Sequence, residues 1–440
     1  MTLPEWLAIA AVLGGLLATV IAVRTVASRC NFSSEGSRKS VHVVMGMGCC
    51  SFPWIFDRPL PVWILAALAT VPILILRLVP FIKNGFGSVL HGIARPSYGE
   101  VLFAPAVAAV FHLSGGNVIL YLVPILILTL ADAAGAMAGT RWGKHIYNSG
   151  DGFKSIEGSC GFLLVAFASI LLPMACIGPT DFAHAVWIAL ILATLAMMAE
   201  GFSDRGFDNI ILPLGCFFVL DRLIGLEIPS LAGRLIVLIL LLVLVLTGSR
   251  WSSLSGAALL GSAMLGYGCA VLADWRYALP PSAIFVCHLF TTSKRDLKKS
   301  LDHRLDVVIS QAIACMPWVL ASATEIIPPD IGLVGISLAM ATQLAQLDHS
   351  TRRLIDNAIQ PLRSVSKGFL LAALPGLLWM IPISPSLALP LGIAIVATFV
   401  SLPVSTFAAR KLSANHESGF WFLKGAISLV ASLPALLLLQ

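Results

Sequence analysis

Charged residues are scarce in this sequence: Asp, Glu, Lys and Arg make up only 11% of its 440 residues, whereas hydrophobic residues make up 58%. A soluble domain is about 25% charged and about 45–50% apolar. The apolar runs are also too long and too numerous to share one soluble core. The composition therefore excludes an ordinary soluble protein and predicts an all-α, polytopic transmembrane protein.

Several familiar site patterns are also missing. The nine cysteines lack the paired spacing of a zinc site or a disulfide framework. No basic patch with interleaved aromatic residues is present, so we expect no nucleic-acid partner. The Gly-x4-Gly-Lys-Ser/Thr pattern of a P-loop is absent as well. Any chemistry must therefore come from polar residues in or beside the membrane helices.

Apolar segments of about 15–23 residues predict about sixteen membrane spans. They lie near residues 5–23, 42–56, 60–79, 99–114, 117–139, 159–178, 183–200, 209–226, 235–247, 254–273, 277–293, 305–327, 331–347, 368–384, 386–407 and 419–440. The sequence changes character near Glu227 to Arg234, and the polar motifs described below all precede this point. We therefore expect two membrane domains, residues 1–228 and 229–440.

The distribution of Lys and Arg predicts the orientation, because these residues accumulate in short cytoplasmic loops. With the N-terminus outside, nearly all of them fall at the inner face. The exceptions are Arg58, Arg222, Arg234 and Arg276. The net charge of +6 thus reflects orientation first, and attraction to anionic headgroups second. The longer loops, such as 140–158, also lie inside, so we expect any chemistry at the inner face.

Asp132 lies within the predicted span 117–139, roughly 10 Å below the membrane surface at about 1.5 Å rise per residue. An ionised carboxylate at this depth must be paired, bound to a metal or exposed to a wet cavity. The small residues from Ala131 to Ala136 let another backbone or a ligand approach closely. The pattern favours a functional site, and a protonated or structurally paired aspartate is the alternative.

The loop after Asp132 combines Arg141, Lys144 and Lys154 with several glycines and small hydroxyl residues. Cationic groups neutralise phosphate oxygens, and glycine lets backbone N–H groups point at them. The orientation rule alone would also place cations in an inner loop. Phosphate binding and topology therefore explain this loop equally well.

Arg38, Lys39 and His42 open the second predicted span. If a helix begins by Arg38, then Arg38 and His42 share one face. His42 then either binds a phosphate oxygen, moves a proton or lies at the interface as an ordinary histidine.

Further polar residues gather at the inner ends of other spans. Glu200 ends one span, and Asp208 and Asn209 begin the next, where each could also be a solvated helix cap. The topology brings one set of residues to the same membrane face: Arg38, His42, Glu100, Asp132, Lys154, Glu200, Asp208 and Asn209. Oxygen ligands for Mg²⁺ beside phosphate-binding cations are what metal-assisted phosphoryl or nucleotidyl transfer requires.

These segments resemble the membrane family of phytol kinases and dolichol kinases, which is related more distantly to phosphatidate cytidylyltransferases. The matching motifs are Arg38-Lys39-x-x-His42, Tyr98-Gly99-Glu100 with Pro105, Asp132-Ala133-Ala134 with Gly139 and Gly143, Lys154-Ser155-x-Glu157-Gly158-Ser159, and Glu200 leading to Asp208-Asn209 and Pro213. They cover nearly the whole first half of the chain in order. Relatives more often carry alanine at the position of Gly135.

The resemblance implies a CTP-dependent kinase of a long-chain isoprenoid alcohol, with Mg²⁺, at the cytosolic face of a bacterial inner membrane. It implies that Asp132 helps to hold the metal and that Lys154 binds phosphate during catalysis. Glu200 and Asp208 would complete the metal site, or one of them would act as the base. The remaining nucleotide- and phosphate-binding residues would be Arg38, Lys39, His42, Arg141, Lys144, Ser155, Glu157 and Asn209. Two alternatives stay open: a phosphatidate cytidylyltransferase-like CDP-lipid synthase, and a transporter or lipid flippase without catalysis. The sequence does not indicate an oligomeric state.

The second half resembles, in short patches, the membrane family that includes phytyl-phosphate kinases. The patches are Ser255-Gly256-Ala257, Gly261, Gly266-Tyr267-Gly268 and Phe290-Thr291-Thr292-Ser293-Lys294. The acidic pattern of that family is missing near 340–348, where Gln343, Gln346 and Asp348 stand instead. A degenerate or structural second domain is therefore an equal alternative to a second active site.

Overall fold

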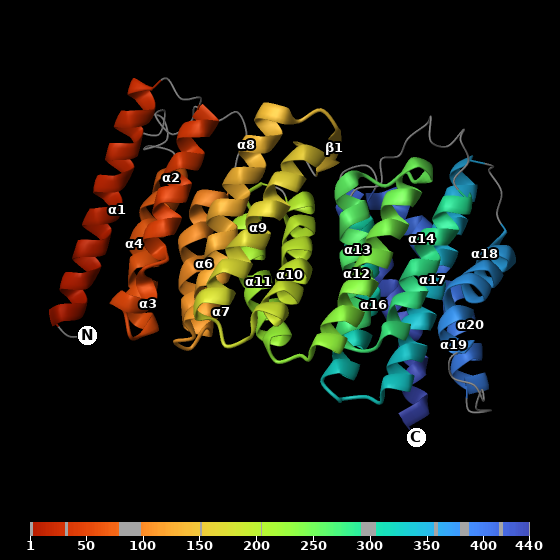
Figure 1. Ribbon diagram of the computed structural model, residues 1–440. Coiled ribbons are helices and arrows are strands. Elements are labelled where there is room, and N and C mark those ends of the chain that lie inside the picture. The colour runs from red at the N-terminus through yellow and green to blue at the C-terminus, as the bar shows by residue number, and fades with distance from the viewer. Residues whose placement is uncertain are drawn as a thin grey trace. The chain divides into compact units, whose positions relative to one another are not determined.

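The computed structural model describes residues 3–30, 34–78, 98–149, 152–203, 205–291, 305–355, 360–378, 387–412 and 417–439 (Figure 1). Within these ranges, nine helices are long and apolar enough to cross a membrane. Three shorter apolar helices accompany them, at Pro59–Ile75, Gly99–Leu113 and Gly256–Leu272. The prediction of an all-α, polytopic membrane protein is confirmed. The count of about sixteen spans and an outer N-terminus stay predictions.

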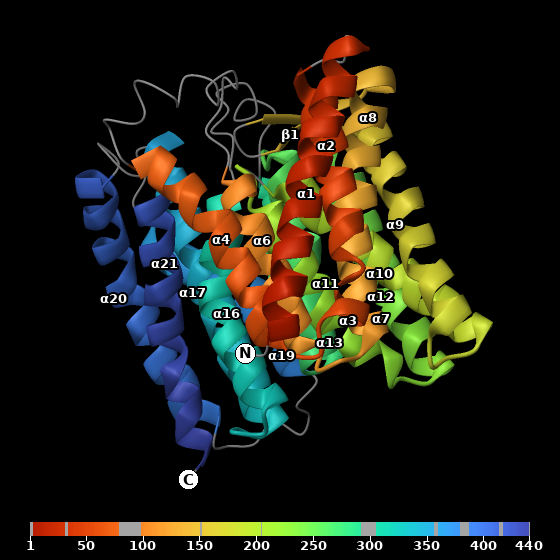
Figure 2. The same cartoon turned by 90° about the vertical axis from the view of Figure 1, so that its left-hand side faces the viewer.

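The chain folds as two compact units, Met1–Leu235 and Ile236–Gln440, which divide within helix α12 (Ile228–Gly248). The first unit consists of α1 (Leu3–Arg29), α2 (Ser34–Cys49), α3 (Phe52–Ile55), α4 (Pro59–Leu78), α6 (Gly99–Leu113), α7 (Val118–Leu126), the π-helical turn η2 (Ile127–Ala131), α8 (Asp132–Trp142), strands β1 (Ile146–Ser149) and β2 (Gly152–Ser155), α9 (Ile156–Ile177), α10 (Phe182–Phe202) and α11 (Asp208–Ile224). Its outermost helix, α1, contacts α2 and α4 and is largely exposed, as suits a helix that faces lipid (Figure 2).

The continuous helix formed by α7, η2 and α8 is the centre of the first unit. The Asn117 side chain begins it by accepting hydrogen bonds from the backbone N–H groups of Ile119 and Leu120. Nearly every side chain from Ile119 to Ala133 is buried against neighbouring helices. Tyr121 reaches across to α2, where its hydroxyl donates to the Cys49 carbonyl at 2.8 Å. This helix therefore carries Asp132 into the interior.

Glycines let α8 and α9 approach backbone to backbone. A Cβ atom at position 158 would lie 3.0 Å from the Gly135 carbonyl oxygen and 3.2 Å from the Gly139 Cα. At position 139, a Cβ atom would meet the Ser155 hydroxyl at 3.2 Å. The small residues around Asp132 therefore serve helix packing, which was one of the two explanations that the sequence allowed.

The second unit is a separate helical bundle. It consists of the last part of α12, the 3₁₀ turn η3 (Ser249–Trp251), α13 (Gly256–Leu272), the 3₁₀ turn η4 (Trp275–Ala278), α14 (Leu279–Thr291), α16 (Leu305–Ala323), α17 (Pro329–Ile355), α18 (Pro361–Gly368), the π-helical turn η5 (Phe369–Ala373), α19 (Leu374–Leu377), α20 (Ala388–Leu412), α21 (Glu417–Ser432) and the 3₁₀ segment η8 (Leu433–Leu439). Helix α17 is its buried centre and contacts α16, α18, α20 and α21.

Two local features differ from the prediction. The second helix begins at Ser34, earlier than the expected span 42–56, so Arg38 and His42 both lie on helix α2. The expected loop 140–158 contains an antiparallel hairpin, β1–β2, which is the one sheet in the described part of the chain. The predicted inner loop 80–98 falls, apart from Tyr98, outside the described residues. One cation cluster of the second half, which could bind a diphosphate or simply mark an inner loop, falls outside them as well: Lys294, Arg295, Lys298, Lys299 and Arg304.

Candidate functional site

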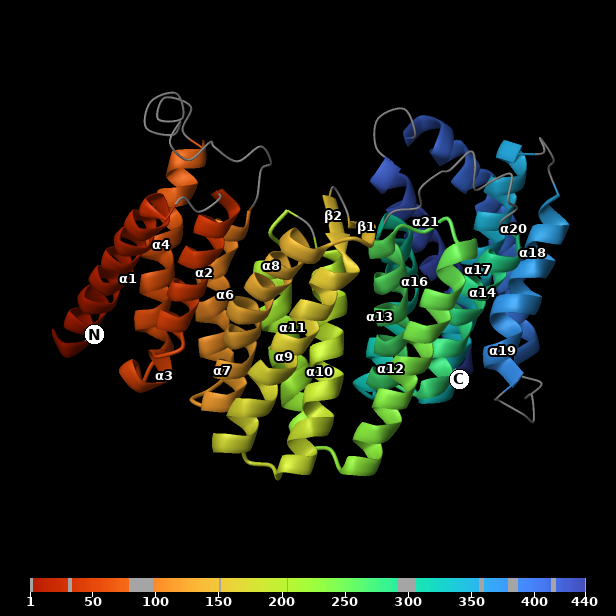
Figure 3. The same cartoon turned by 45° about the horizontal axis from the view of Figure 1, so that its top comes forward.

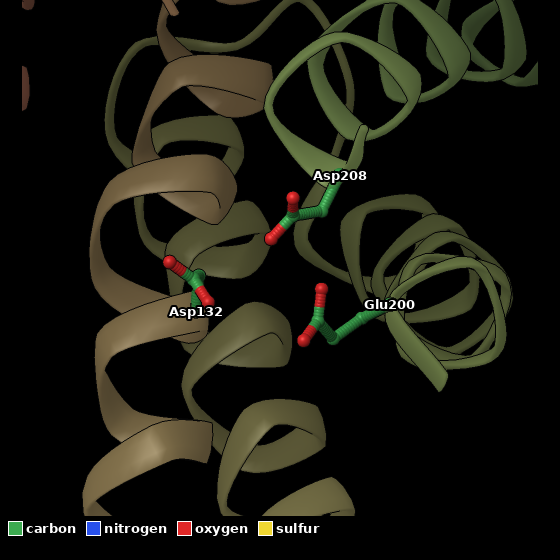
Figure 4. A group of neighbouring side chains, drawn as sticks. All are labelled: Asp132, Glu200 and Asp208. Carbon is green, nitrogen blue, oxygen red and sulfur yellow. The ribbon is translucent and has the colours of Figure 1, made fainter. Parts of the chain in front are cut away.

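Three carboxylates from three helices of the first unit face one another (Figure 4). Asp132 is the first residue of α8, Glu200 lies near the end of α10, and Asp208 is the first residue of α11. One oxygen of each carboxylate lies within 4.8 Å of the others. Among the described residues, no other group of three potential metal ligands is found.

Helix α2 fixes the position of Asp132. The Lys39 ammonium donates to Asp132 Oδ2 at 2.5 Å, and both side chains are buried. One turn further along α2, His42 Nε2 lies 3.0 Å from the Leu128 carbonyl oxygen, in the π-helical turn that precedes Asp132. A π-turn interrupts the regular hydrogen-bond ladder of a helix, so this carbonyl can accept from a side chain. His42 therefore carries its proton on Nε2 and stabilises the turn that presents Asp132.

The β1–β2 hairpin brings a second cation to the carboxylates. The Lys154 ammonium donates to Glu200 Oε1 at 2.7 Å and also to the Glu200 backbone carbonyl. Burial lowers the pKa of Lys154, but the charge and hydrogen bond of Glu200, together with smaller contributions from Asp208 and Tyr147, raise the pKa above its usual value. Lys154 therefore remains a cation at physiological pH.

The connection between α10 and α11 turns Asp208 toward the other two carboxylates. Arg205 and Gly206 have positive φ angles of 52° and 84°, which reverse the chain just before α11. The Tyr98 backbone N–H donates to the Arg205 carbonyl at 2.8 Å and ties this turn to the start of α6. Asp208 can thus approach Glu200 although the two residues belong to different helices.

The donor set suits a hard divalent cation. All three groups are carboxylates, the ligand type that Mg²⁺ prefers. Glu200 Oε2 and Asp208 Oδ1 are buried, and neither has a hydrogen-bond partner among the described residues. A buried carboxylate oxygen without a partner is costly unless an ion or water satisfies it. These residues therefore fit a magnesium ion.

The curated phytol kinase of Synechocystis sp. is 30% identical to this chain over 229 residues, which cover 49% of this chain and 91% of the relative. This chain belongs to the phytol kinase family. No family model and no solved structure matches the chain. Family membership supports a kinase, and hence a transferase, with several membrane helices. The alignment leaves about half of the chain unmatched. The resemblance to dolichol kinases stays a prediction, and so does the resemblance of the second half to the family that includes phytyl-phosphate kinases.

The structure brings together six of the residues that the family motifs suggested. They are Lys39, His42, Asp132, Lys154, Glu200 and Asp208. Asn209 follows Asp208 and is buried, with no hydrogen-bond partner for its Oδ1 among the described residues. The roles of all seven in catalysis, metal binding or phosphate binding stay predictions.

Other suggested residues lie at the edge of the site or serve the local fold. Arg38, Arg141 and Lys144 are exposed. Ser155 caps α9 by accepting from the Gly158 N–H at 3.1 Å. Glu157 closes the base of the hairpin, where it accepts from the Lys144 and His145 N–H groups and from the His145 ring at 2.7 Å. Phosphate binding by these five residues stays a prediction.

The sequence analysis missed the contacts that hold the hairpin in place. The Ser149 hydroxyl donates to the Gly201 carbonyl at 2.8 Å, directly after Glu200. The Tyr147 hydroxyl shares a 2.8 Å hydrogen bond with Ser159, and burial raises the pKa of Tyr147. The available signal was the sequence Gly150-Asp151 between two short stretches, 146–149 and 152–155.

The close packing of α2 on η2 leads to a prediction about stability. Gly46→Ala is expected to destabilise the protein by about 1–3 kcal/mol, because a Cβ atom at position 46 would overlap the buried Thr129 side chain. Thermal unfolding in detergent would measure the effect. Gly14→Ala is the matched control, since a Cβ atom there meets nothing within 4 Å. Equal unfolding temperatures for the two variants would contradict the packing that positions Lys39 and His42.

Proposed function

We propose that this chain transfers the γ-phosphoryl group of CTP to a long-chain isoprenoid alcohol, such as phytol or a polyprenol, at the cytosolic face of the membrane. The observation that carries the proposal is the meeting of Asp132, Glu200 and Asp208 beside Lys39 and Lys154. Membership in the phytol kinase family supports the same reaction class. We also propose that the membrane is the inner membrane of a bacterium.

The charges in the site suit a nucleotide. Three carboxylates and two lysines give a formal charge of −1, which a divalent cation would reverse. Mg²⁺, when bound by Asp132, Glu200 and Asp208, would neutralise charge on the transferring phosphoryl group. Lys39 and Lys154, which pair with two of these carboxylates, would then donate to phosphate oxygens. Arg38, exposed at the start of α2, would then contact the nucleotide from outside.

In the proposed reaction, the alcohol oxygen attacks the γ-phosphorus, a new P–O bond forms and the bond between the γ-phosphorus and the β,γ-bridging oxygen breaks. CDP leaves, and the hydroxyl proton passes to a carboxylate. Glu200 and Asp208 are the candidates for this base, because each keeps one buried oxygen that has no partner among the described residues. Asp132 is less suited, since Lys39 occupies its Oδ2 and, among the described residues, neither of its oxygens is a buried atom without a partner.

The test is to incubate the purified protein with Mg²⁺ and CTP labelled on either the γ- or the α-phosphate, together with phytol, farnesol, geranylgeraniol, dolichol or diacylglycerol. Transfer of the γ-label to an isoprenoid alcohol is the expected result, and parallel reactions with labelled ATP test the nucleotide. Transfer of the α-label to added phosphatidate would instead indicate a cytidylyltransferase. Uptake of lipid into vesicles without nucleotide turnover would indicate a transporter.

Removing the metal is expected to abolish transfer. In the presence of excess EDTA the carboxylates would repel the nucleotide, because their charges would no longer be compensated. Added Mg²⁺ should restore the rate, and Ca²⁺ should restore it poorly because its ligand shell is larger and less regular. Full activity in EDTA would contradict the proposed metal site. The measurement is the rate at which the γ-label of CTP becomes lipid-soluble in the same assay.

We further propose that the second unit is either a phytyl-phosphate-kinase-like domain or a structural one. Its central helix carries Asp348, which pairs with Lys367 at 2.7 Å and accepts from Ser364 at 2.9 Å. Gln343 bonds to Ser310 and Ser428 on neighbouring helices. A lipid product with two phosphates in the assay above would favour a second active site.

A further inference from the structure

One face of the β1–β2 hairpin holds it to the rest of the first unit, and the other face carries two exposed, large apolar side chains beside Asn148 and the buried Ser155. Tyr147 pairs with Lys154 across the strands, and both side chains contact the first unit, at Ser159 and Glu200. Because side chains alternate along a strand, Ile146 and Phe153 lie on the opposite face. There they are 65% and 72% exposed. The hydrogen bonds of Tyr147 and Lys154 hold the hairpin in this orientation.

The apolar surface continues from the hairpin onto the two adjoining helices. Trp142, the last residue of α8, is 62% exposed, and Ile156, the first residue of α9, is 55% exposed. We call Trp142, Ile146, Phe153 and Ile156 the hairpin patch. Four large apolar side chains so close in sequence are unusual on a surface that faces only water. The patch therefore calls for an apolar neighbour.

The position of the hairpin indicates what that neighbour is. The strands connect two helices that are each long and apolar enough to cross a membrane, so the hairpin lies where both helices reach one membrane surface (Figure 3). Exposed Arg141 and Lys144 flank the patch, and the Arg141 guanidinium lies 5.5 Å from the centre of the Trp142 ring. Aromatic and cationic residues together are typical of the layer between acyl chains and headgroups.

We propose that the hairpin patch docks into the interfacial layer of an anionic bilayer. The apolar side chains lie among the upper acyl chains, and Arg141 and Lys144 lie at the level of the lipid phosphates. The opposite face of the same hairpin holds Lys154 against Glu200, so docking fixes the carboxylates close to the depth of the lipid headgroups. The inference does not depend on the proposed phosphoryl transfer.

A depth measurement tests this inference without any activity assay. The nine cysteines are replaced, and a nitroxide is attached at Phe153→Cys in protein reconstituted into vesicles of phosphatidylcholine with a minority of phosphatidylglycerol. The expected result is greater collision of the label with oxygen than with a water-soluble nickel chelate. A label at Lys144→Cys should show the reverse preference. Greater collision with nickel at position 153 would overturn the proposal, as would exclusion of both reagents, which indicates a protein partner.

The unmodified protein provides a second measurement in case the cysteine-free variant does not fold. In the same vesicles, phosphatidylcholine with a photoreactive diazirine near the headgroup end of its acyl chain should label residues of the hairpin patch. Leu164, 70% exposed on α9, should be labelled when the diazirine lies deeper in the chain. The double substitution Ile146→Asp with Phe153→Asp should remove the hairpin label and keep the Leu164 label. Labelling of Leu164 without any labelling of the wild-type hairpin would overturn the proposal.

Discussion

Replacing Asp132 with asparagine lowers phosphoryl transfer by at least about 100-fold, if the three carboxylates act together on a metal-bound nucleotide. Asparagine keeps the shape of the side chain and one oxygen, but it removes the negative charge next to Glu200 and Asp208. The rate of transfer of the CTP γ-label to an isoprenoid alcohol in detergent measures the loss.

The same substitution also leaves the Lys39 ammonium buried without its partner, which would destabilise the protein by about 3–5 kcal/mol. The double variant Asp132→Asn with Lys39→Met removes both charges and should recover thermal stability while transfer remains lost. Asp348→Asn is a matched control, because Asp348 is also a buried aspartate paired with a lysine, Lys367. The Asp348→Asn variant should lose stability but still transfer the γ-phosphoryl group to the isoprenoid alcohol. Recovery of both stability and activity in the double variant would show that Asp132 is purely structural.

The assembly of this site was predictable in part because topology restricts where helix ends can lie. Glu200 ends one apolar segment and Asp208 begins the next, so both had to emerge at the same membrane face. Asp132 lies within an apolar segment, and its charge alone marked it as costly. Composition and segment lengths were enough to predict an all-α, polytopic membrane protein, whereas the count of about sixteen spans stays a prediction. The structure divides the chain within α12, after Leu235.

The pairing of individual charges was not predictable from the sequence. Lys39 and Asp132 are separated by 93 residues, and their contact depends on how α2 packs against the π-helical turn. No local rule distinguishes Lys39, which is buried, from its neighbour Arg38, which is exposed. The hairpin was missed for a different reason: a short, basic connection between two spans was explained by topology, so its alternating side chains received no separate interpretation.

Replacing Lys154 with glutamine is expected to raise the KM for the nucleotide and to lower kcat/KM by about 10- to 100-fold. The estimate follows from the loss of a charge-assisted hydrogen bond to phosphate, about 1.5–3 kcal/mol. Glutamine can still donate to the Glu200 carbonyl, so the hairpin should stay in place. Because Glu200 raises the pKa of Lys154, the wild-type side chain stays protonated throughout the neutral and mildly alkaline range. The difference between variant and wild type should therefore not change across that range.

Lys367→Gln separates a role in phosphate binding from a role in folding. Lys367 and Lys154 each donate to a carboxylate at 2.7 Å, and each links two elements of its own unit, but only Lys154 lies beside the three carboxylates. Both substitutions should lower the unfolding temperature, because each leaves a carboxylate without its cation. Only Lys154→Gln should raise the KM for CTP. If the two variants lowered kcat/KM equally, Lys154 would stabilise the fold without contacting the nucleotide, and the phosphate contacts would have to come from Lys39 and the exposed Arg38 on α2.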